Sequence, residues 1–234
     1  MYASTFLMRD GRVANLTEHL DRLRDAGNVS PVRIGQLRGE LRDLGPGLYL
    51  PLIQAVGATV SLDPRPTIRP EDEIIVDAEG IPDERLRPTD KGPDLGWQVQ
   101  RLARLRQSGA DEGLLIDERG AVVSGVLSAL LCLDEGTAHI SAHPRTSYSV
   151  TLDAALALLA ESGVDVVEHP EGLGMPMLRT TETWALNSSE GVRLVTGWLE
   201  YGSVLPPRTG GRPRAGAPTH REINGRMWEL AEEV

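Results

Sequence analysis

Residues 80–94 read GIPDERLRPTDKGPD and divide the chain into two parts. Three prolines and a run of charged residues interrupt any apolar period here, a composition typical of a boundary between domains. On both sides, short strand-like runs alternate with helical patterns, which predicts an α/β fold in a two-domain, α+β arrangement. We expect a small N-terminal α/β domain over 1–84, a linker over 85–90, a larger C-terminal α/β domain over 91–205, and a flexible arm with a terminal helix over 206–234.

The spacing of apolar residues predicts the individual elements. Leucines at helical spacing indicate one helix around Leu20 and Leu23 and another around Leu37 and Leu41. The segment from Glu73 to Asp77 is predicted as a strand of the first sheet. In the second half, the pattern predicts helices over about 95–105, 151–162 and 221–233, and a strand pair over 183–187 and 192–196.

Composition excludes some classes of partner. At 234 residues and 40% hydrophobic content, the chain is long enough to bury a core, and its net charge of -10 opposes nucleic-acid binding, which requires a clustered basic surface. The start of the chain lacks the pattern of a signal peptide and no stretch reaches the length of a membrane span, so we expect a cytoplasmic protein without a membrane partner. The only cysteine, Cys132, lies in an apolar run and is predicted as a buried thiol.

Lysine occurs once, at Lys91, whereas arginine supplies the other 23 of the 24 basic residues. A lysine amine can lose its proton near neutral pH when it is desolvated and can then attack a carbonyl, a reaction that a guanidinium cannot perform. Lys91 is therefore a candidate for Schiff-base chemistry. The alternative is an arginine-biased composition in which the surviving lysine is an ordinary surface charge.

Three segments together resemble one enzyme family. They read EHLDRL over 18–23, KGPDL over 91–95 and GADEGLLID over 109–117. In this order they resemble the class IV aminotransferases, pyridoxal-phosphate enzymes of fold type IV that include branched-chain and D-amino acid transaminases and aminodeoxychorismate lyase. The resemblance extends from about Ser4 to Trp198. It implies pyridoxal 5'-phosphate in the cleft between the domains, a small amino acid or keto acid as substrate, and a homodimer.

The resemblance also implies roles for single residues. Lys91 matches the lysine that holds the pyridoxal aldehyde as a Schiff base and later moves the proton at the substrate's α carbon. Arg22 matches an arginine that binds the cofactor phosphate, to which a guanidinium can donate two parallel hydrogen bonds. The other phosphate contacts that it implies are a backbone amide at Val150 and the hydroxyl groups of Thr151, Ser188 and Ser189. The plainer alternatives are a solvated charge for Arg22, helix capping by Ser149 or Thr151, and an ordinary turn at the two serines.

One position departs from the family pattern. Relatives usually carry a glutamate at the position of Ser124, where its carboxylate pairs with the pyridine nitrogen of the cofactor. A neutral hydroxyl supplies no charge there, so the ring withdraws electrons less strongly, which favours elimination over transamination. Three hypotheses stay open: an aminotransferase, a lyase of the aminodeoxychorismate lyase type, and a relative that uses the cleft without the cofactor, for binding or for other chemistry.

The remaining polar clusters carry weaker signals. The five histidines show no metal-ligand spacing with cysteine or carboxylates, so we expect no metal site. The carboxylates of Asp111 and Glu112 are predicted to lie in a solvated turn.

Overall fold

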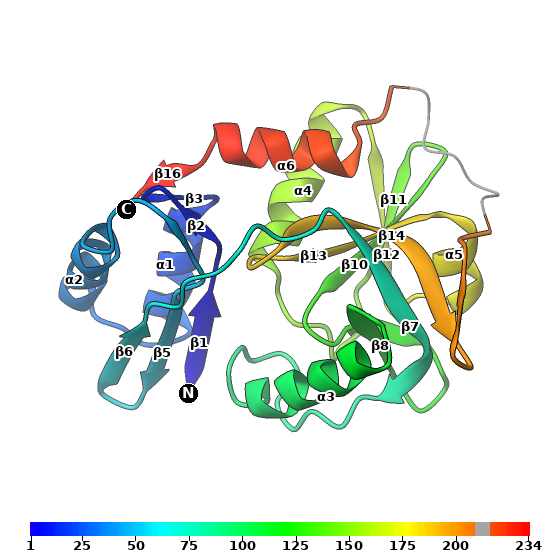
Figure 1. The fold of residues 1–234 in the computed structure, drawn as a ribbon, viewed down its shortest axis with the longest axis horizontal. Helices are drawn as coiled ribbons and strands as arrows, with labels where there is room; N and C mark the ends of the chain where they lie inside the picture. Colours follow the sequence, from blue (N-terminus) through cyan, green and yellow to red (C-terminus); the bar gives the residue numbers. More distant parts are fainter. Residues whose placement is uncertain (209–215) are drawn as a thin grey trace.

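Two groups of strands and helices make up the computed structural model, which describes residues 1–208 and 216–234. Figure 1 shows the smaller group, built mainly from the start of the chain, on the left and the larger group on the right. The mixture of strands and helices in both groups confirms the predicted α/β class.

The smaller group contains two sheets and two helices. An antiparallel sheet has the order β1-β5-β6, with β1 (Tyr2–Thr5), β5 (Leu52–Val56) and β6 (Thr59–Asp63). A second sheet has the order β16-β3-β2-β4, with β2 (Met8–Arg9), β3 (Arg12–Val13), β4 (Leu48–Tyr49) and β16 (Glu232–Glu233). The helices are α1 (Leu16–Asp25) and α2 (Pro31–Arg42). The leucines that predict these helices are buried in one core with the sheet residues, which confirms both helices.

A mixed nine-stranded sheet forms the centre of the larger group, in the order β12-β11-β10-β13-β14-β7-β8-β9 with β15 paired to β14. Its first strands in sequence are β7 (Glu73–Pro82), β8 (Glu112–Ile116), β9 (Val122–Gly125), β10 (Ala129–Asp134) and β11 (Thr137–Ser141). They are followed by β12 (Asp165–His169), β13 (Glu182–Asn187), β14 (Gly191–Glu200) and β15 (Ser203–Leu205). The expected strand pair around residues 188–191 is confirmed as β13 and β14.

Helices cover both faces of this sheet. They are α3 (Leu95–Gln107), α4 (Val150–Glu161), α5 (Met175–Thr180) and α6 (His220–Glu229). Alternate residues of a strand point to opposite faces, and Leu131 packs in the core of α4 and α6 while its neighbour Cys132 packs in the core of α5. In the same way Leu115 packs with α3 and Leu114 with α5. α3 therefore lies on the face opposite α5, and Cys132 is buried as predicted.

The assignment of residues 73–77 to the first sheet is wrong. They belong to β7, which pairs in parallel with β14 and with β8 inside the nine-stranded sheet. Both partners come much later in the chain, so no local pattern distinguishes the two sheets. β7 also continues to Pro82, and the predicted domain limits at residues 84 and 91 stay a proposal.

The end of the chain returns to the smaller group. The helix expected over 221–233 is shorter, because α6 ends at Glu229 and β16 then pairs with β3. Figure 1 shows α6 crossing from the larger group toward the smaller one. The Arg42 guanidinium donates to the carbonyl oxygen of Val234 at 2.7 Å and holds this end. Of the arm expected after residue 205, residues 209–215 lie outside the described residues.

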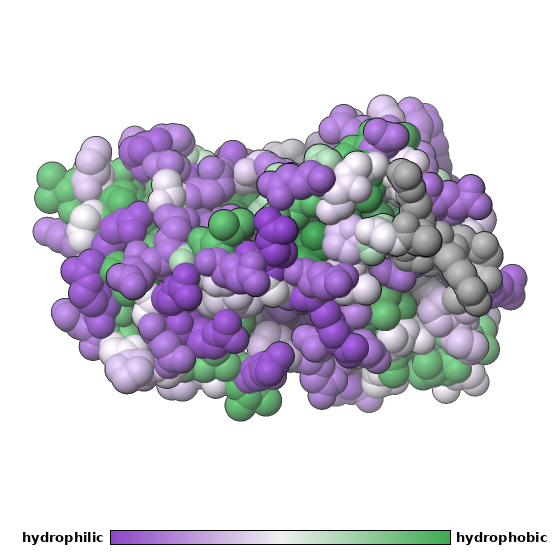
Figure 2. Space-filling model, turned by 90° about the horizontal axis from the view of Figure 1, so that it is seen from above, coloured by the Kyte–Doolittle hydropathy of each residue, from purple (hydrophilic) through white to green (hydrophobic). Residues whose placement is uncertain are grey.

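The surface agrees with the composition. Figure 2 shows one face on which hydrophilic side chains predominate and hydrophobic ones occur in small groups. In the described ranges, no helix combines the length and the apolar character that crossing a membrane requires.

Candidate active site

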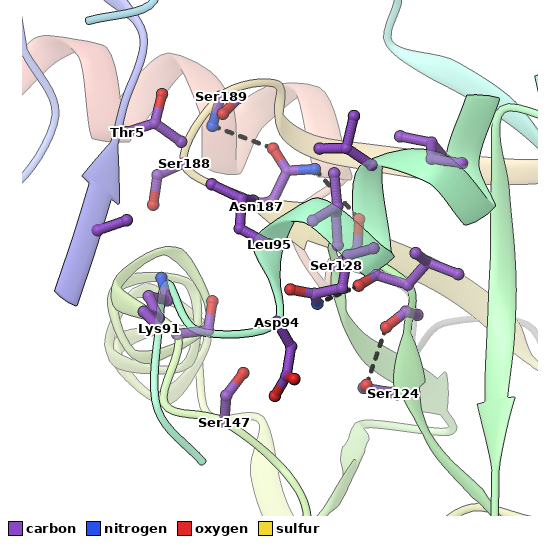
Figure 3. A pocket seen from close by; sticks show the side chains of 18 of the residues that line it. Thr5, Lys91, Asp94, Leu95, Ser124, Ser128, Ser147, Asn187, Ser188 and Ser189 are labelled. Carbon is purple, nitrogen blue, oxygen red and sulfur yellow. Dashed lines mark hydrogen bonds between the residues drawn. The ribbon is translucent and has the colours of Figure 1, made fainter. Parts of the chain in front are cut away.

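A cavity of about 610 Å³ lies where the two groups meet. Its walls come from β1 and β5, the loop between β7 and α3, one side of α3, the β9–β10 connection, the segment before α4 and the β13–β14 turn. Four of the residues that the sequence singles out line this cavity, namely Lys91, Ser124, Ser188 and Ser189 (Figure 3). The structure therefore brings together residues that are far apart in the chain.

Lys91 enters the cavity from the loop between β7 and α3. Its carbonyl oxygen accepts a hydrogen bond from the amide of Ala3 at 3.0 Å, which ties this loop to β1. Gly92 follows with φ of 122°, and a Cβ there would lie 2.8 Å from the amide nitrogen of Ala3, so this close approach requires glycine. Burial, and after it the positive charge of Arg22, lower the pKa of the Lys91 amine to about 8. Lys91 is thus a desolvated amine and not an ordinary surface charge.

A buried ion cluster fixes the same loop. The side chain of Asp83 is 1% exposed and accepts hydrogen bonds from the Nε atoms of Arg85 and Arg145, both at 2.8 Å. Arg145 also donates to the carbonyl oxygens of Asp83 and Arg85, both at 2.8 Å. Burial raises the pKa of Asp83, but the two guanidiniums outweigh it and hold this pKa at about 2. The loop before Lys91 is therefore fastened to the segment before α4.

Arg22 lies behind the cavity wall. Its guanidinium carbon stacks 3.9 Å from the ring centre of Tyr148, which lines the cavity and donates to Glu18 Oε1 at 3.0 Å. The Nε of Arg22 is buried and finds no hydrogen-bond partner among the residues that the structure describes. A buried N–H group without an acceptor costs free energy, so this guanidinium suits an anion such as phosphate.

The start of α4 meets the β13–β14 turn at the cavity. The hydroxyl oxygens of Thr151 and Ser188 lie 3.0 Å apart, and Thr151 is buried. Ser149 caps the helix by accepting from the amide of Leu152 at 3.3 Å, so Thr151 is not needed as a cap. Val150 is the first residue of α4 and is also buried. Ser149, which caps this helix, lines the cavity, so the partial positive charge of the helix start lies at the cavity wall.

Ser124 lies on the other side of the cavity from Lys91 in Figure 3. It is 7% exposed, and its hydroxyl donates to the carbonyl oxygen of Gly125 at 2.8 Å. The lining residues that follow it, up to Ala129, are all uncharged. This wall has no carboxylate facing the cavity.

Sequence reasoning misses other polar residues at the site. Glu112 does not lie in a solvated turn: it is 1% exposed and accepts from Ser128 Oγ at 2.6 Å, a partner that only the fold brings near. Asn187 shapes the β13–β14 turn, and an asparagine that precedes Ser-Ser-Glu-Gly is the signal for such a turn. His19 is buried, and burial together with the charge of Lys91 lowers its pKa to about 3, so the ring is neutral.

Fold and cavity define a two-part α/β protein that presents a desolvated amine in a cleft. The chain belongs to the class IV aminotransferase family, because its residues 3–198 match the family model described as "Amino-transferase class IV". Homologues in this family are pyridoxal-phosphate-dependent transaminases or lyases.

Individual relatives agree with this placement. A protein of Methanocaldococcus jannaschii named "Putative branched-chain-amino-acid aminotransferase" is 26% identical over 189 residues, which span 69% of this chain and 66% of the relative. The apo form of a hypothetical aminotransferase from Mycobacterium tuberculosis is 16% identical with a TM-score of 0.75, covering 98% of this chain and 89% of its own. A solved structure of that same protein is a PLP-bound form. A structure named "Putative 4-amino-4-deoxychorismate lyase" is 20% identical with a TM-score of 0.74, covering 97% of this chain and 89% of its own. These likenesses confirm the fold-type-IV architecture.

Proposed function

We propose that this protein is a pyridoxal-phosphate-dependent enzyme that transfers the amino group of a small amino acid and attaches the cofactor covalently to Lys91. One observation carries the proposal. A desolvated lysine amine lines a cavity together with Ser188, whose hydroxyl oxygen lies 3.0 Å from that of Thr151. The guanidinium of Arg22 lies behind the wall at Tyr148, and its buried Nε has no partner among the described residues. An amine and an anion site placed together are what an aldehyde with a phosphate group requires.

The residues fit the two reactive ends of this cofactor. Lys91 would form the Schiff-base linkage to the aldehyde, and Ser124 would face the ring nitrogen. When bound, the cofactor supplies an electron-withdrawing ring next to the α carbon of the substrate. The phosphate would be held by Arg22, by the amide of Val150 and by the hydroxyl groups of Thr151, Ser188 and Ser189.

Lys91 also has the protonation behaviour that moving a proton at the α carbon requires. With a pKa of about 8, a fraction on the order of one tenth of the Lys91 amines is unprotonated at pH 7. Arg22 favours the neutral amine by charge repulsion, and the neutral ring of His19 adds no further positive charge. Lys91 can therefore accept a proton and return it near neutral pH.

A second activity, elimination of the aminodeoxychorismate lyase type, is favoured by Ser124. Its hydroxyl is engaged with the carbonyl oxygen of Gly125 and supplies no negative charge at the ring side of the cavity. A ring that withdraws electrons less strongly handicaps transamination more than elimination.

We also propose a homodimer, as the family resemblance implies. Light scattering on the purified protein is expected to give a mass twice that of the chain. A mass equal to that of one chain would contradict this part of the proposal.

The central experiment tests attachment to Lys91. Purified protein is mixed with pyridoxal phosphate, reduced with borohydride and digested, and the adduct is located by mass spectrometry; we expect it on Lys91. The variant Lys91→Arg keeps the positive charge and is expected to carry no adduct. A wild-type protein without any adduct would overturn the pyridoxal-phosphate proposal and favour a cofactor-free use of the cavity.

A second assay separates the two activities. Loaded enzyme is given an amino acid with and without a keto-acid acceptor. Formation of a new amino acid from the acceptor supports transfer. Pyruvate released without an acceptor in amounts well above that of the enzyme supports elimination, because transfer without an acceptor stops after one keto acid per active site.

A further inference from the structure

Asn187 uses all four of its side-chain hydrogen-bonding positions at the β13–β14 turn. Its Oδ1 accepts from the amides of Ser189 at 3.0 Å and Glu190 at 2.8 Å. Its Nδ2 donates to Ser128 Oγ at 3.1 Å and to Glu190 Oε2 at 2.7 Å. Figure 3 shows the Asn187 side chain between the turn and Ser128. The side chain thus replaces main-chain hydrogen bonds inside the turn and links the turn to a neighbouring segment.

The link continues into the buried interior. Ser128 Oγ donates to the carboxylate of Glu112 at 2.6 Å, and Glu112 also accepts from the amides of Gly113 at 3.0 Å and Val126 at 2.9 Å. Glu112 is 1% exposed and belongs to β8, in the interior of the large sheet. A buried carboxylate with this many donors is a rigid anchor, because moving it would leave several groups unpaired. Asn187 is therefore tied through Ser128 to a fixed point of the sheet.

The residue inside the turn is Ser188. Its hydroxyl oxygen lies 3.0 Å from that of Thr151, and its carbonyl oxygen accepts from the amide of Leu7 at 2.7 Å. The amides of Ser189 and Glu190 are already satisfied by Asn187, so the turn offers its serine hydroxyls to the cavity. Their position depends on the shape of the turn, which Asn187 sets.

We propose that Asn187 is a positioning residue that holds Ser188 and Ser189 where they grip the phosphate of the cofactor, with buried Glu112 as its anchor through Ser128. This inference rests on the proposed function, because it assigns the turn to the phosphate. Asn187 itself does not touch the reacting atoms. It acts through the two serines.

The test compares pyridoxal phosphate with pyridoxal, which has the same aldehyde and ring but no phosphate. Dissociation constants of both are measured by absorbance titration for the wild type and for Asn187→Ala. We expect Asn187→Ala to raise the dissociation constant of pyridoxal phosphate by about tenfold or more, because one or two hydrogen bonds to a charged group are lost. The dissociation constant of pyridoxal should change by less than about threefold. A purely structural role would weaken both ligands equally, and such a result would overturn the proposal.

Two further variants complete the test. Asn224→Ala is the matched control, because the Asn224 side chain makes two hydrogen bonds with Val192 of the same hairpin, at 2.9 and 2.7 Å, outside the turn. It is expected to show no selective loss. Ser128→Ala removes the anchor while it leaves the turn's own bonds intact, and we expect a smaller loss that is again selective for the phosphate. If Asn187→Ala does not fold, Ser128→Ala still tests the proposal. Equal changes in the dissociation constants of both ligands would again refute the positioning role of Asn187. If the wild type binds neither ligand, the proposed function itself fails, which is a different outcome.

Discussion

The two long walls of the cavity differ in charge. The charged wall contains Lys91, Arg22 behind it, and the buried cluster of Asp83, Arg85 and Arg145 that fixes the loop. The neutral wall consists of residues 124–129, which present no charge to the cavity, while Glu112 behind them is turned into the sheet. The cavity thus has a buried amine with a guanidinium behind it at one part of its lining, and only hydroxyl groups, a glycine and apolar side chains along residues 124–129.

This difference separates two tasks of a pyridoxal-phosphate enzyme. Holding the cofactor requires an amine and an anion site, and the charged wall supplies the amine and, through Arg22, the charged part of the anion site. Tuning the electron demand of the ring requires a carboxylate, which the neutral wall lacks at Ser124. We therefore expect strong effects from changes in the charged wall and small ones from changes in the neutral wall.

The largest effect is expected for Asp83→Asn, which breaks the anchor of the charged wall. Removing a buried carboxylate leaves two guanidiniums without their shared partner, a change that typically costs about 3–5 kcal/mol of unfolding free energy. Urea unfolding of the wild type and the variant measures this loss. An unfolding free energy equal to that of the wild type would show that the loop does not depend on the cluster.

The Asp83 cluster also predicts how the unfolding free energy changes in acid. The pKa of Asp83 in the folded protein, about 2, lies below its ordinary value of 3.8. Its contribution to stability is therefore fully present above the ordinary pKa and is lost as the pH falls from about 4 toward 2. We expect the difference in unfolding free energy between wild type and Asp83→Asn to shrink over this range.

The next effect is expected for Arg22→Gln. The loss of a charge-assisted hydrogen bond to phosphate should raise the dissociation constant of pyridoxal phosphate by about 10- to 100-fold. Pyridoxal, which has no phosphate, should be affected little. Arg24→Gln is the control on the same helix, since Arg24 is exposed and pairs with Asp21 and Asp25 at the surface. Equal dissociation constants for Arg22→Gln and Arg24→Gln would remove Arg22 from the phosphate site.

A smaller effect concerns the pH dependence of attachment to Lys91. Because the neutral amine reacts and its pKa is about 8, the rate of adduct formation should rise about tenfold per pH unit below that value and level off above it. In Arg22→Gln the midpoint should move to higher pH, because a nearby positive charge that lowers the pKa is gone. Stopped-flow absorbance at several pH values gives both midpoints. Identical midpoints would mean that Arg22 does not act on Lys91.

The smallest effect is expected for Ser124→Glu in the neutral wall. A carboxylate there should raise the ratio of transamination to elimination by at most about tenfold, the equivalent of one pKa unit at the ring nitrogen. Ser124→Gln is the control, because it has the same size without the charge. The ratio is measured with the acceptor assay, and a ratio that rises equally in both variants would show that shape, not charge, distinguishes the two walls.

Local sequence was sufficient for features that depend on neighbours along the chain. Helical spacing identified α1 and α2, and the turn residues at 188–191 identified the β13–β14 pair. It was insufficient for β7, for the buried cluster around Asp83 and for Glu112. Each of these obtains its partners from segments far away in the chain, and charged residues in a stretch rich in proline look like solvated linker when those partners are unknown.

The sequence by itself determined which chemical groups the protein contains: one lysine amine, an arginine in the segment EHLDRL, and a serine in place of a carboxylate at position 124. Only the tertiary structure decided how these groups behave. Burial beside Arg22 lowers the pKa of Lys91, the cluster around Asp83 holds its loop, and Asn187 shapes the turn of Ser188. Desolvation and hydrogen bonding depend on which segments pack together, and that information is not contained in any short stretch of the chain.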